Sequence, residues 1–150
     1  MADFATPQPG DKFLWVRYHG LGDLLEAMAD AYQVKRKFPD IRLSFLSCLE
    51  YTEILKSQPY IEDVIYGGKS PFKVMKQTAQ TMKNGNYNWV ASTFKGVHMT
   101  VMAYMSGIQN RLGSSKYLPF LETANIYDWT KAHGINLFQR TEKSLFASEE

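Results

Sequence analysis

The sequence predicts an α/β domain built on a parallel β-sheet with helices on both of its faces. Short apolar runs rich in β-forming residues alternate along the chain with segments of helical periodicity. The runs are apolar at successive positions, as in strands that are covered on both sides. Glycine or proline separates most neighbouring segments. Strands that alternate with helices favour one parallel sheet with right-handed crossovers.

The first strand–turn–helix unit is the clearest. Residues 13–18 form a mostly apolar run, and the glycine-containing turn at residues 19–22 ends it. Asp23 is a natural N-cap for the helix that follows, and Pro39 ends that helix. Between them, apolar side chains recur at helical spacing at Leu24, Ala27, Met28, Ala31, Val34 and Phe38.

The same pattern repeats as far as residue 113. Further strands are expected at residues 41–46, 63–66, 89–93 and 110–113. Helices are expected at residues 49–57, 71–83 and 97–105. The alternation indicates a Rossmann-like parallel sheet flanked by helices.

The segment after residue 113 has a weaker pattern. A single helix is expected at residues 121–134, with Leu121, Ala124 and Tyr127 on one side. Trp129 lies off this stripe, and Gly134 would end the helix. Residues 144–150 resemble the beginning of a further element.

Length and composition fit one ordinary soluble domain. Of the 150 residues, 45% are apolar and 21% are charged, which excludes a largely disordered chain. Residues 1–12, with prolines and a glycine, are expected to be a flexible leader, and residues 13–150 the domain. The formal net charge of +2 is too small for a nucleic-acid-binding surface. The basic triplet at residues 35–37 suits the end of a helix.

Cysteine content and hydropathy favour the cytoplasm. Cys48 is the only cysteine, so an intramolecular disulfide and a multi-cysteine metal site are both excluded. No apolar run approaches the roughly 18 residues of a membrane span, and the first residues have no signal-peptide pattern.

The turn between the first strand and the first helix carries the strongest functional signal. Gly20 and Gly22 have no Cβ, so a ligand can approach the backbone closely there. The helix that follows offers free N–H groups and a partial positive charge. Asp23 at this point is suited either to accept a proton from a hydroxyl or to cap the helix, and both roles stay open.

This segment, Arg17-Tyr18-His19-Gly20-Leu21-Gly22-Asp23, resembles the opening motif of glycosyltransferase family 9, the heptosyltransferases of lipopolysaccharide assembly. The resemblance continues in register over residues 13–113. It is carried by Phe38-Pro39-Asp40, by Tyr51 to Leu55, by Pro59-Tyr60-Ile61-Glu62-Asp63-Val64-Ile65, by Asn86-Tyr87 with Lys95-Gly96, and by Arg111-Leu112-Gly113. The chain departs from the family pattern at His19, Met28, Ala29, Thr93 and Lys95.

The resemblance implies an inverting glycosyltransferase of the GT-B architecture, in which two Rossmann-like halves enclose a cleft. The amino-terminal half holds the acceptor, and the carboxy-terminal half binds the nucleotide of the donor. This chain has the length of the first half only, so we expect the nucleotide-binding half to be absent and the isolated chain to be inactive. The family implies that Asp23 is the general base.

The resemblance also implies the substrates. The donor would be a nucleotide sugar such as ADP-heptose, used as a substrate without a further cofactor. The acceptor would be a lipopolysaccharide-type glycolipid or an oligosaccharide, which implies peripheral contact with the inner face of the cytoplasmic membrane. No metal is implied, because the chain contains no D-x-D carboxylate pair.

Further ligand contacts are expected near Asp23. Arg17 would meet an anionic acceptor or form a surface ion pair, and His19 would bind a phosphate or hydroxyl or remain an exposed loop residue. Lys95 and His98 follow the fourth expected strand and would lie at the same sheet edge. The histidines have no helical pairing, which argues against a metal site.

Two other classes of function remain open at this stage. The chain is also compatible with a non-catalytic Rossmann-like module that binds a nucleotide or nucleotide sugar and acts through a partner protein. A purely structural interaction domain would bind neither nucleotide nor glycan.

Overall fold

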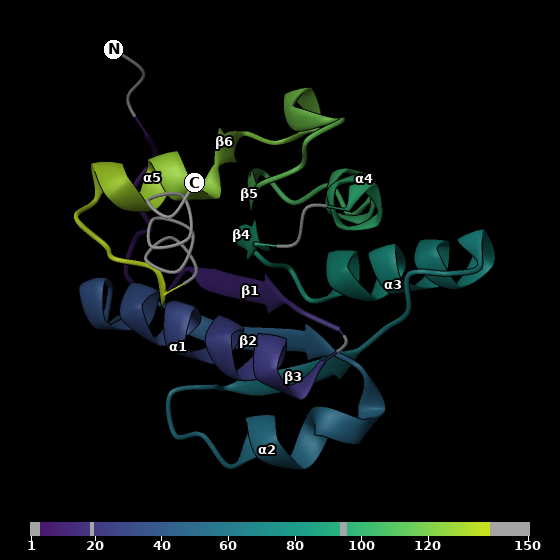
Figure 1. Ribbon diagram of the computed structural model, residues 1–150, viewed down its shortest axis with the longest axis horizontal. Helices are drawn as coiled ribbons and strands as arrows, with labels where there is room; N and C mark the ends of the chain where they lie inside the picture. The colour runs from purple at the N-terminus through teal and green to yellow at the C-terminus, as the bar shows by residue number, and fades with distance from the viewer. Residues whose placement is uncertain (1–3, 19, 94–95, 139–150) are drawn as a thin grey trace, which may run out of the picture.

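The computed structural model confirms a Rossmann-like α/β fold with one six-stranded sheet (Figure 1). It describes residues 4–18, 20–93 and 96–138. All neighbouring strands are parallel, in the order β3-β2-β1-β4-β5-β6. The strands are β1 (Lys12–Val16), β2 (Arg42–Ser47), β3 (Asp63–Tyr66), β4 (Trp89–Ala91), β5 (Asn110–Gly113) and β6 (Ala124–Asn125).

Helices cover both faces of the sheet, and each face has its own apolar cluster. Side chains of α1, α2 and α5 pack on one face, and those of α3 and α4 pack on the other. The helices are α1 (Leu21–Lys37), η1 (Leu49–Tyr51), α2 (Thr52–Lys56), α3 (Phe72–Asn84), α4 (Val97–Met105), η2 (Pro119–Leu121) and α5 (Ile126–Ala132). No helix among the described residues is long and apolar enough to cross a membrane.

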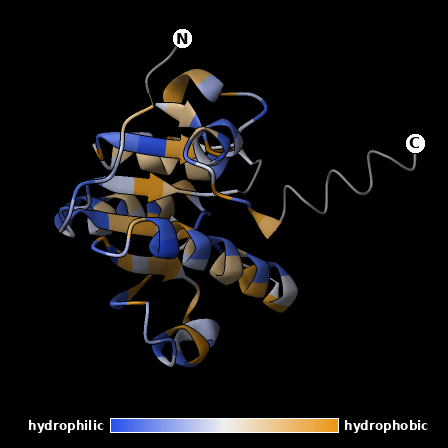
Figure 2. Cartoon of the chain, turned by 90° about the vertical axis from the view of Figure 1, so that its left-hand side faces the viewer, coloured by the Kyte–Doolittle hydropathy of each residue, from blue (hydrophilic) through white to orange (hydrophobic). Residues whose placement is uncertain are grey.

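The central strand β1 shows why its sequence is apolar throughout. Phe13 and Trp15 belong to the cluster under α1, whereas Leu14 and Val16 belong to the cluster under α3 and α4. Successive side chains of a strand point to opposite faces, so a strand covered on both sides needs an apolar residue at every position. Figure 2 shows hydrophobic colours on parts of the strands in the middle of the molecule and a mixture of hydrophobic and hydrophilic colours along the helices.

Most expected elements are present, with shifted ends. The third and fifth expected strands and the helix at residues 97–105 have the expected bounds. The strand expected at residues 13–18 spans Lys12–Val16, and the one expected at residues 89–93 ends at Ala91. The helix expected at residues 49–57 is divided into the 3-10 turn η1 and the short helix α2.

The single helix expected at residues 121–134 is wrong. A 3-10 turn and the two-residue strand β6 precede α5, because Ala124 pairs with Leu112 at the sheet edge. The Asn125 side chain then caps α5 by accepting hydrogen bonds from the backbone N–H groups of residues 127 and 128. Trp129, expected to lie off the buried stripe, is only 1% exposed and packs against Phe13.

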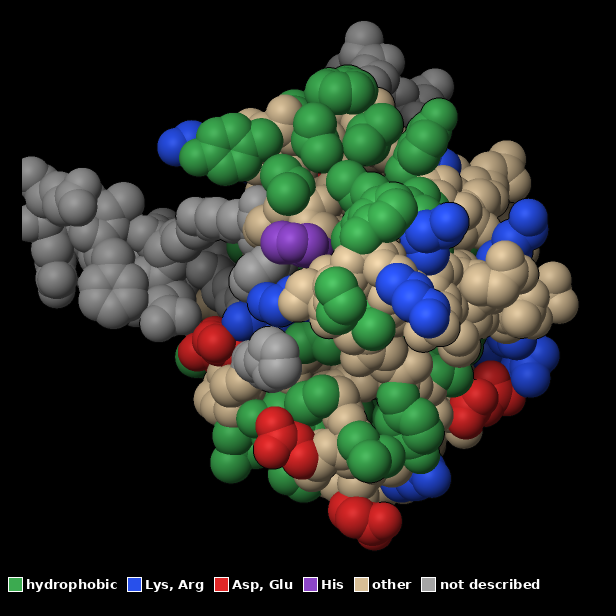
Figure 3. All heavy atoms as spheres, turned by 90° about the vertical axis from the view of Figure 1, so that its right-hand side faces the viewer, with side chains coloured by type: hydrophobic (Ala, Val, Ile, Leu, Met, Phe, Trp, Pro, Cys, Tyr) green, Lys and Arg blue, Asp and Glu red, His purple; other side chains and the backbone are tan. Residues whose placement is uncertain are grey.

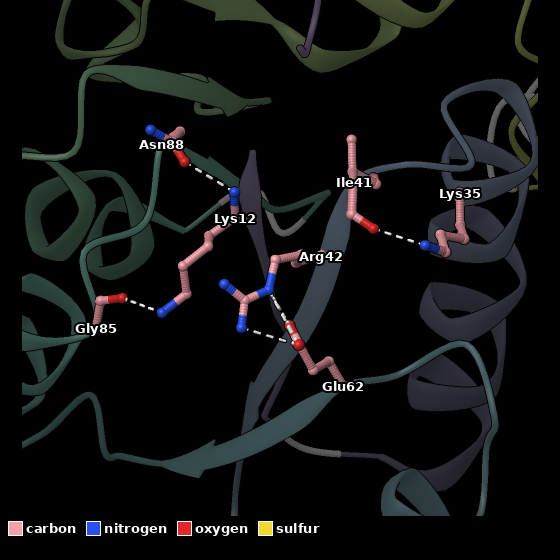
Figure 4. A network of polar contacts seen from close by, with 7 residues as sticks. All are labelled: Lys12, Lys35, Ile41, Arg42, Glu62, Gly85 and Asn88. Atoms are coloured by element: carbon pink, nitrogen blue, oxygen red, sulfur yellow. Dashed lines mark hydrogen bonds and ion pairs between the residues drawn. The ribbon is translucent and has the colours of Figure 1, made fainter. Parts of the chain in front are cut away.

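Polar contacts close the amino edge of the sheet (Figure 4). The Lys12 backbone N–H donates to Asn88 Oδ1 at 2.8 Å, and the Lys12 ammonium group donates to the Gly85 carbonyl. Arg42 and Glu62 form an exposed ion pair with 3.0 Å between nitrogen and oxygen. The side chains that make these contacts at the amino edge are therefore paired within the fold.

The basic triplet at residues 35–37 lies in the last turn of α1, as expected. Lys35 Nζ donates to the carbonyl oxygens of Pro39 and Ile41 at 2.7 and 2.6 Å. This lysine therefore joins the end of α1 to the start of β2, in a position where a cation suits the helix dipole.

Residues 4–6 of the segment expected to be a leader contact α5 and the residue that follows it. The Trp129 indole N–H donates to the Ala5 carbonyl at 2.8 Å, and Thr6 Oγ1 lies 3.3 Å from His133 Nε2. Phe4 also packs on the cluster under α1.

Candidate functional site

The carboxyl edge of the sheet collects the turns that follow the strands. The chain passes from β1 outward through β2 and β3, then returns to β4 on the other side of β1. The strand order therefore reverses between β1 and β4. In open parallel sheets, ligands bind at such a switch point, beyond the carboxyl ends of the strands. The amino ends of α1 and α4 flank it.

Asp23 lies in the first turn of α1, at this switch point. The prediction that Asp23 is the N-cap is wrong, because α1 begins at Leu21 and its N-cap is Gly20, which has a φ of 86°. Glycine adopts this left-handed conformation without steric cost, so the helix begins before Asp23. The Asp23 side chain is 54% exposed and its carboxylate is available at the sheet edge.

Arg17 forms an ion pair with Asp23, with 2.9 Å between Arg17 Nη2 and Asp23 Oδ2. The Arg17 side chain is only 13% exposed, so this contact is more protected than a typical surface pair. Of the two roles considered for Arg17, an ion pair is thus present, and its partner is the candidate base itself.

The two glycines of the turn differ in their steric demands. Gly20 is required by its positive φ, and a Cβ there would lie 2.9 Å from Asp23 Oδ2 and so displace the carboxylate. Gly22 is exposed in the helix and nothing lies within 4 Å of a Cβ built there. A side chain at position 22 would therefore point into open space, apart from its neighbours in the chain.

The structure places one of the remaining residues that were expected to contact a ligand. His98 is exposed in the first turn of α4, on the opposite face of the sheet from α1 but at the same edge. His19 and Lys95 lie outside the described residues. Within the described residues, no group of three or more His, Cys, Asp or Glu side chains is arranged to hold a metal ion.

A groove of about 420 Å³ opens beside the ends of β2 and β3. Its lining is uncharged and consists of Cys48, Leu49, Tyr66, Gly67, Gly68, Val74, Gln77, Thr78 and Thr81. Thr78 Oγ1 lies 2.9 Å from both the nitrogen and the oxygen of Gly68, which ties the β3–α3 turn to α3. Burial and the nearby Glu50 raise the pKa of the Cys48 thiol, which disfavours the nucleophilic thiolate.

Glu122 is a half-buried carboxyl group that sequence reasoning missed. Its Oε1 accepts hydrogen bonds from the Ser115 backbone N–H at 2.8 Å and from Thr100 Oγ1 at 3.4 Å. A Cβ on Gly113 would lie 2.7 Å from the carboxyl carbon. Burial raises the pKa of Glu122, and the two hydrogen bonds partly offset this effect. In the sequence, only Gly113 pointed to this contact, because a residue without a Cβ permits the close approach of the carboxyl group.

No family profile matches the sequence, and no curated protein matches it. Solved structures match its fold, at low sequence identity.

The similar solved structures include glycosyltransferases. The glycosyl transferase family 9 protein from Veillonella parvula matches with a TM-score of 0.76 and 11% identity over 89% of this chain and 44% of that chain. E. coli heptosyltransferase WaaC with ADP matches with a TM-score of 0.66 and 13% identity, over 85% of this chain and 49% of its own. E. coli ADP-heptose lps heptosyltransferase II matches with a TM-score of 0.61 and 13% identity, over 68% and 30%.

These matches establish a fold like that of the family 9 heptosyltransferases, as the sequence motifs implied. The chain spans between 30% and 50% of the length of the solved structures it resembles.

Substitution of the two turn glycines is expected to have opposite effects. Gly20→Ala places a side chain at a φ of 86° and against Asp23, so it should lower the free energy of unfolding by about 1–3 kcal/mol. Gly22→Ala should leave it unchanged or raise it by less than about 1 kcal/mol. Urea denaturation of both variants measures this difference, and equal effects would contradict it.

Glu122→Gln is expected to change how stability depends on pH. The folded protein holds the Glu122 proton to a higher pH than the unfolded chain does, because the pKa of Glu122 is raised on folding. The stability that comes from proton binding to Glu122 is therefore lost as pH rises through the raised pKa. The variant should therefore be more stable than the wild type at neutral pH, and the difference should shrink at acidic pH. Thermal unfolding across pH measures it. The exposed Glu53→Gln is the matched control, and a parallel pH dependence in wild type and Glu122→Gln would contradict the expectation.

Proposed function

We propose that this chain is the acceptor-binding half of an inverting glycosyltransferase, which moves a sugar from a nucleotide-activated donor to a hydroxyl group of a glycan or glycolipid. The observation that carries the proposal is the exposed Asp23 carboxylate at the amino end of α1. It lies at the switch point of a sheet whose fold matches that of heptosyltransferases.

Asp23 acts as the general base in this proposal. The acceptor hydroxyl gives its proton to the Asp23 carboxylate while its oxygen attacks the anomeric carbon of the donor sugar. The bond between that carbon and the diphosphate oxygen breaks, and the nucleoside diphosphate leaves with the bonding electrons. Attack from the side opposite the leaving group inverts the configuration at the anomeric carbon.

The surroundings of Asp23 suit this role. Arg17 pairs with one carboxylate oxygen at 2.9 Å and so holds the side chain at the carboxyl edge of the sheet. Gly22, which is exposed and precedes Asp23 in the chain, adds no side chain that would obstruct an acceptor. His98, at the same sheet edge, is available to contact the acceptor.

The donor is proposed to be a nucleotide sugar such as ADP-heptose. The solved structures of similar fold include E. coli heptosyltransferase WaaC with ADP and with ADP-2-deoxy-2-fluoro heptose. This chain corresponds to half or less of those proteins. We therefore place the nucleotide contacts on a second lobe that faces the carboxyl edge of the sheet.

Exposed aromatic side chains support a glycolipid acceptor at a membrane surface. They are Tyr104, Tyr117 and Phe120, which are 56%, 71% and 74% exposed and come from α4, from the segment that leads into η2, and from η2 itself, which contacts α4. We call them the aromatic face. Arg111 and Lys116 lie over the rings of Tyr104 and Tyr117 at 5.5 and 5.8 Å. Figure 3 shows hydrophobic and basic side chains together in the upper part of this side of the molecule, with the acidic ones in the lower part. Aromatic and basic groups together favour an interface with anionic lipid.

Asp23→Asn in the intact protein tests the chemistry. The amide cannot accept the acceptor proton, so kcat for transfer from ADP-heptose to a lipopolysaccharide-type acceptor should fall by about 100-fold or more. Asp128→Asn, in the first turn of α5, is the matched control and should retain activity. Unchanged kcat in Asp23→Asn would remove Asp23 from the mechanism. Nucleotide binding without any transfer would favour the non-catalytic module instead.

The aromatic face is tested with vesicles. The double variant Tyr117→Ser/Phe120→Ser loses apolar surface that would enter the lipid interface, so less of it should sediment with vesicles of anionic lipid than of the wild type. Tyr32→Ser, which removes an exposed ring from α1, is the control and should bind like the wild type. Equal sedimentation of the double variant and the wild type would exclude this face as the membrane contact.

A further inference from the structure

Three polar side chains form a row across the sheet at the amino end of α1. Val16 of β1 is level with Leu46 of β2, and the Arg17 N–H continues this ladder by donating to the Leu46 carbonyl at 3.0 Å. The next level therefore pairs Arg17 with Ser47. On the other side, Trp15 is level with Ala91, which brings Thr93 level with Arg17. Neighbouring strands lie about 4.8 Å apart, so the three side chains are adjacent.

The row faces α1. Trp15, Phe45 and Ala91 all belong to the apolar cluster beneath α1. Side chains two positions apart on a strand share a face, which assigns Arg17 and Ser47 to the same face and predicts it for Thr93 just beyond β4. The ion pair from Arg17 to Asp23 of α1 agrees with this direction. We call this set, Ser47, Arg17 and Thr93, the polar row.

Both hydroxyl groups of the polar row lack a hydrogen-bond partner among the described residues. Ser47 is 0% exposed and Thr93 is 6% exposed. Buried hydroxyl groups in folded proteins are nearly always hydrogen-bonded, so two such exceptions on either side of one arginine need an explanation. The Arg17 side chain, which is 13% exposed, gives the row its contact with solvent.

The first turn of α1 adds further donors above the row. α1 is 17 residues long, and its N-cap Gly20 provides no side-chain acceptor for the first N–H groups. The amino end of a helix with unpaired N–H groups favours an anion. A guanidinium group, two hydroxyl groups and a helix amino end therefore converge at the switch point, and every one of them can donate a hydrogen bond.

We propose that the polar row and the first turn of α1 form an oxyanion-binding site, which takes a phosphate or carboxylate group. In the structure the Asp23 carboxylate forms an ion pair with the Arg17 guanidinium. A ligand oxyanion takes its place, receives hydrogen bonds from Ser47 and Thr93, and releases Asp23. Released in this way, the carboxylate turns toward the acceptor hydroxyl only when the anionic ligand is present.

The release of Asp23 toward an acceptor rests on the proposed function, whereas anion binding by the polar row does not. The oxyanion has two sources in a transfer reaction: an anionic group of the acceptor, or the diphosphate of the donor. Inorganic phosphate and ADP are therefore titrated separately against the chain. Displacement of bound phosphate by ADP would assign the site to the diphosphate, and phosphate binding that ADP does not displace would assign it to the acceptor.

The test is a titration of the chain with phosphate, monitored by NMR or calorimetry. It measures binding and requires no enzymatic activity. Ser47→Ala and Thr93→Val each remove one donor to a charged group, so the dissociation constant for phosphate should rise about tenfold. Both variants should be as stable as the wild type or more stable, because each removes an unpartnered buried hydroxyl. A merely structural role would give the reverse, with lower stability and unchanged phosphate binding.

Two further variants complete the experiment. Asp23→Asn removes the competing carboxylate and should lower the dissociation constant for phosphate, the opposite of its effect on kcat. Arg42→Ala, which breaks the ion pair with Glu62 at the other edge of the same sheet, is the control and should leave phosphate binding unchanged. Absence of saturable phosphate binding to the wild type, or unchanged binding in Arg17→Ala, would overturn the site. Neither result would affect the test of Asp23 as a base.

Discussion

Burial of both faces of the parallel sheet is the constraint on which the rest of the structure depends. The central strands place apolar side chains alternately under α1 and under α3 and α4, because a polar group buried on either face costs free energy. Most charged groups therefore lie at the two ends of the strands. Structural contacts such as Lys12 with Asn88 occupy the amino edge. The carboxyl edge holds Arg17 and Asp23, the groups on which the proposed function is built.

Much of this arrangement could be predicted from sequence, because it follows from hydropathy. The alternation of strands and helices gave the sheet, and the helix at residues 97–105 has its expected bounds. The two-residue strand β6 was missed, because pairing at an edge leaves no periodic pattern in so short a segment. The Asp23 cap was wrong for a local reason: Gly20 adopts a positive φ and begins the helix earlier.

Some residues of the candidate site could likewise be predicted from the sequence, and others could not. The sequence motif located the Gly20 turn and Asp23, since those residues are consecutive. It could not locate Ser47 and Thr93 beside Arg17, because their adjacency depends on the register between strands that are distant in sequence. Glu122 was hidden for a similar reason, since its partners Ser115 and Thr100 come from a loop and a helix on either side of β5.

The packing under α1 also determines how the protein can be observed. Trp15, Trp89 and Trp129 are the three tryptophans of the chain, all are at most 2% exposed, and all lie in the one apolar cluster beneath α1. Tryptophan fluorescence of this protein therefore reports on one buried apolar cluster. It will follow the unfolding of that cluster closely, and it will respond weakly to ligands that bind at the carboxyl edge.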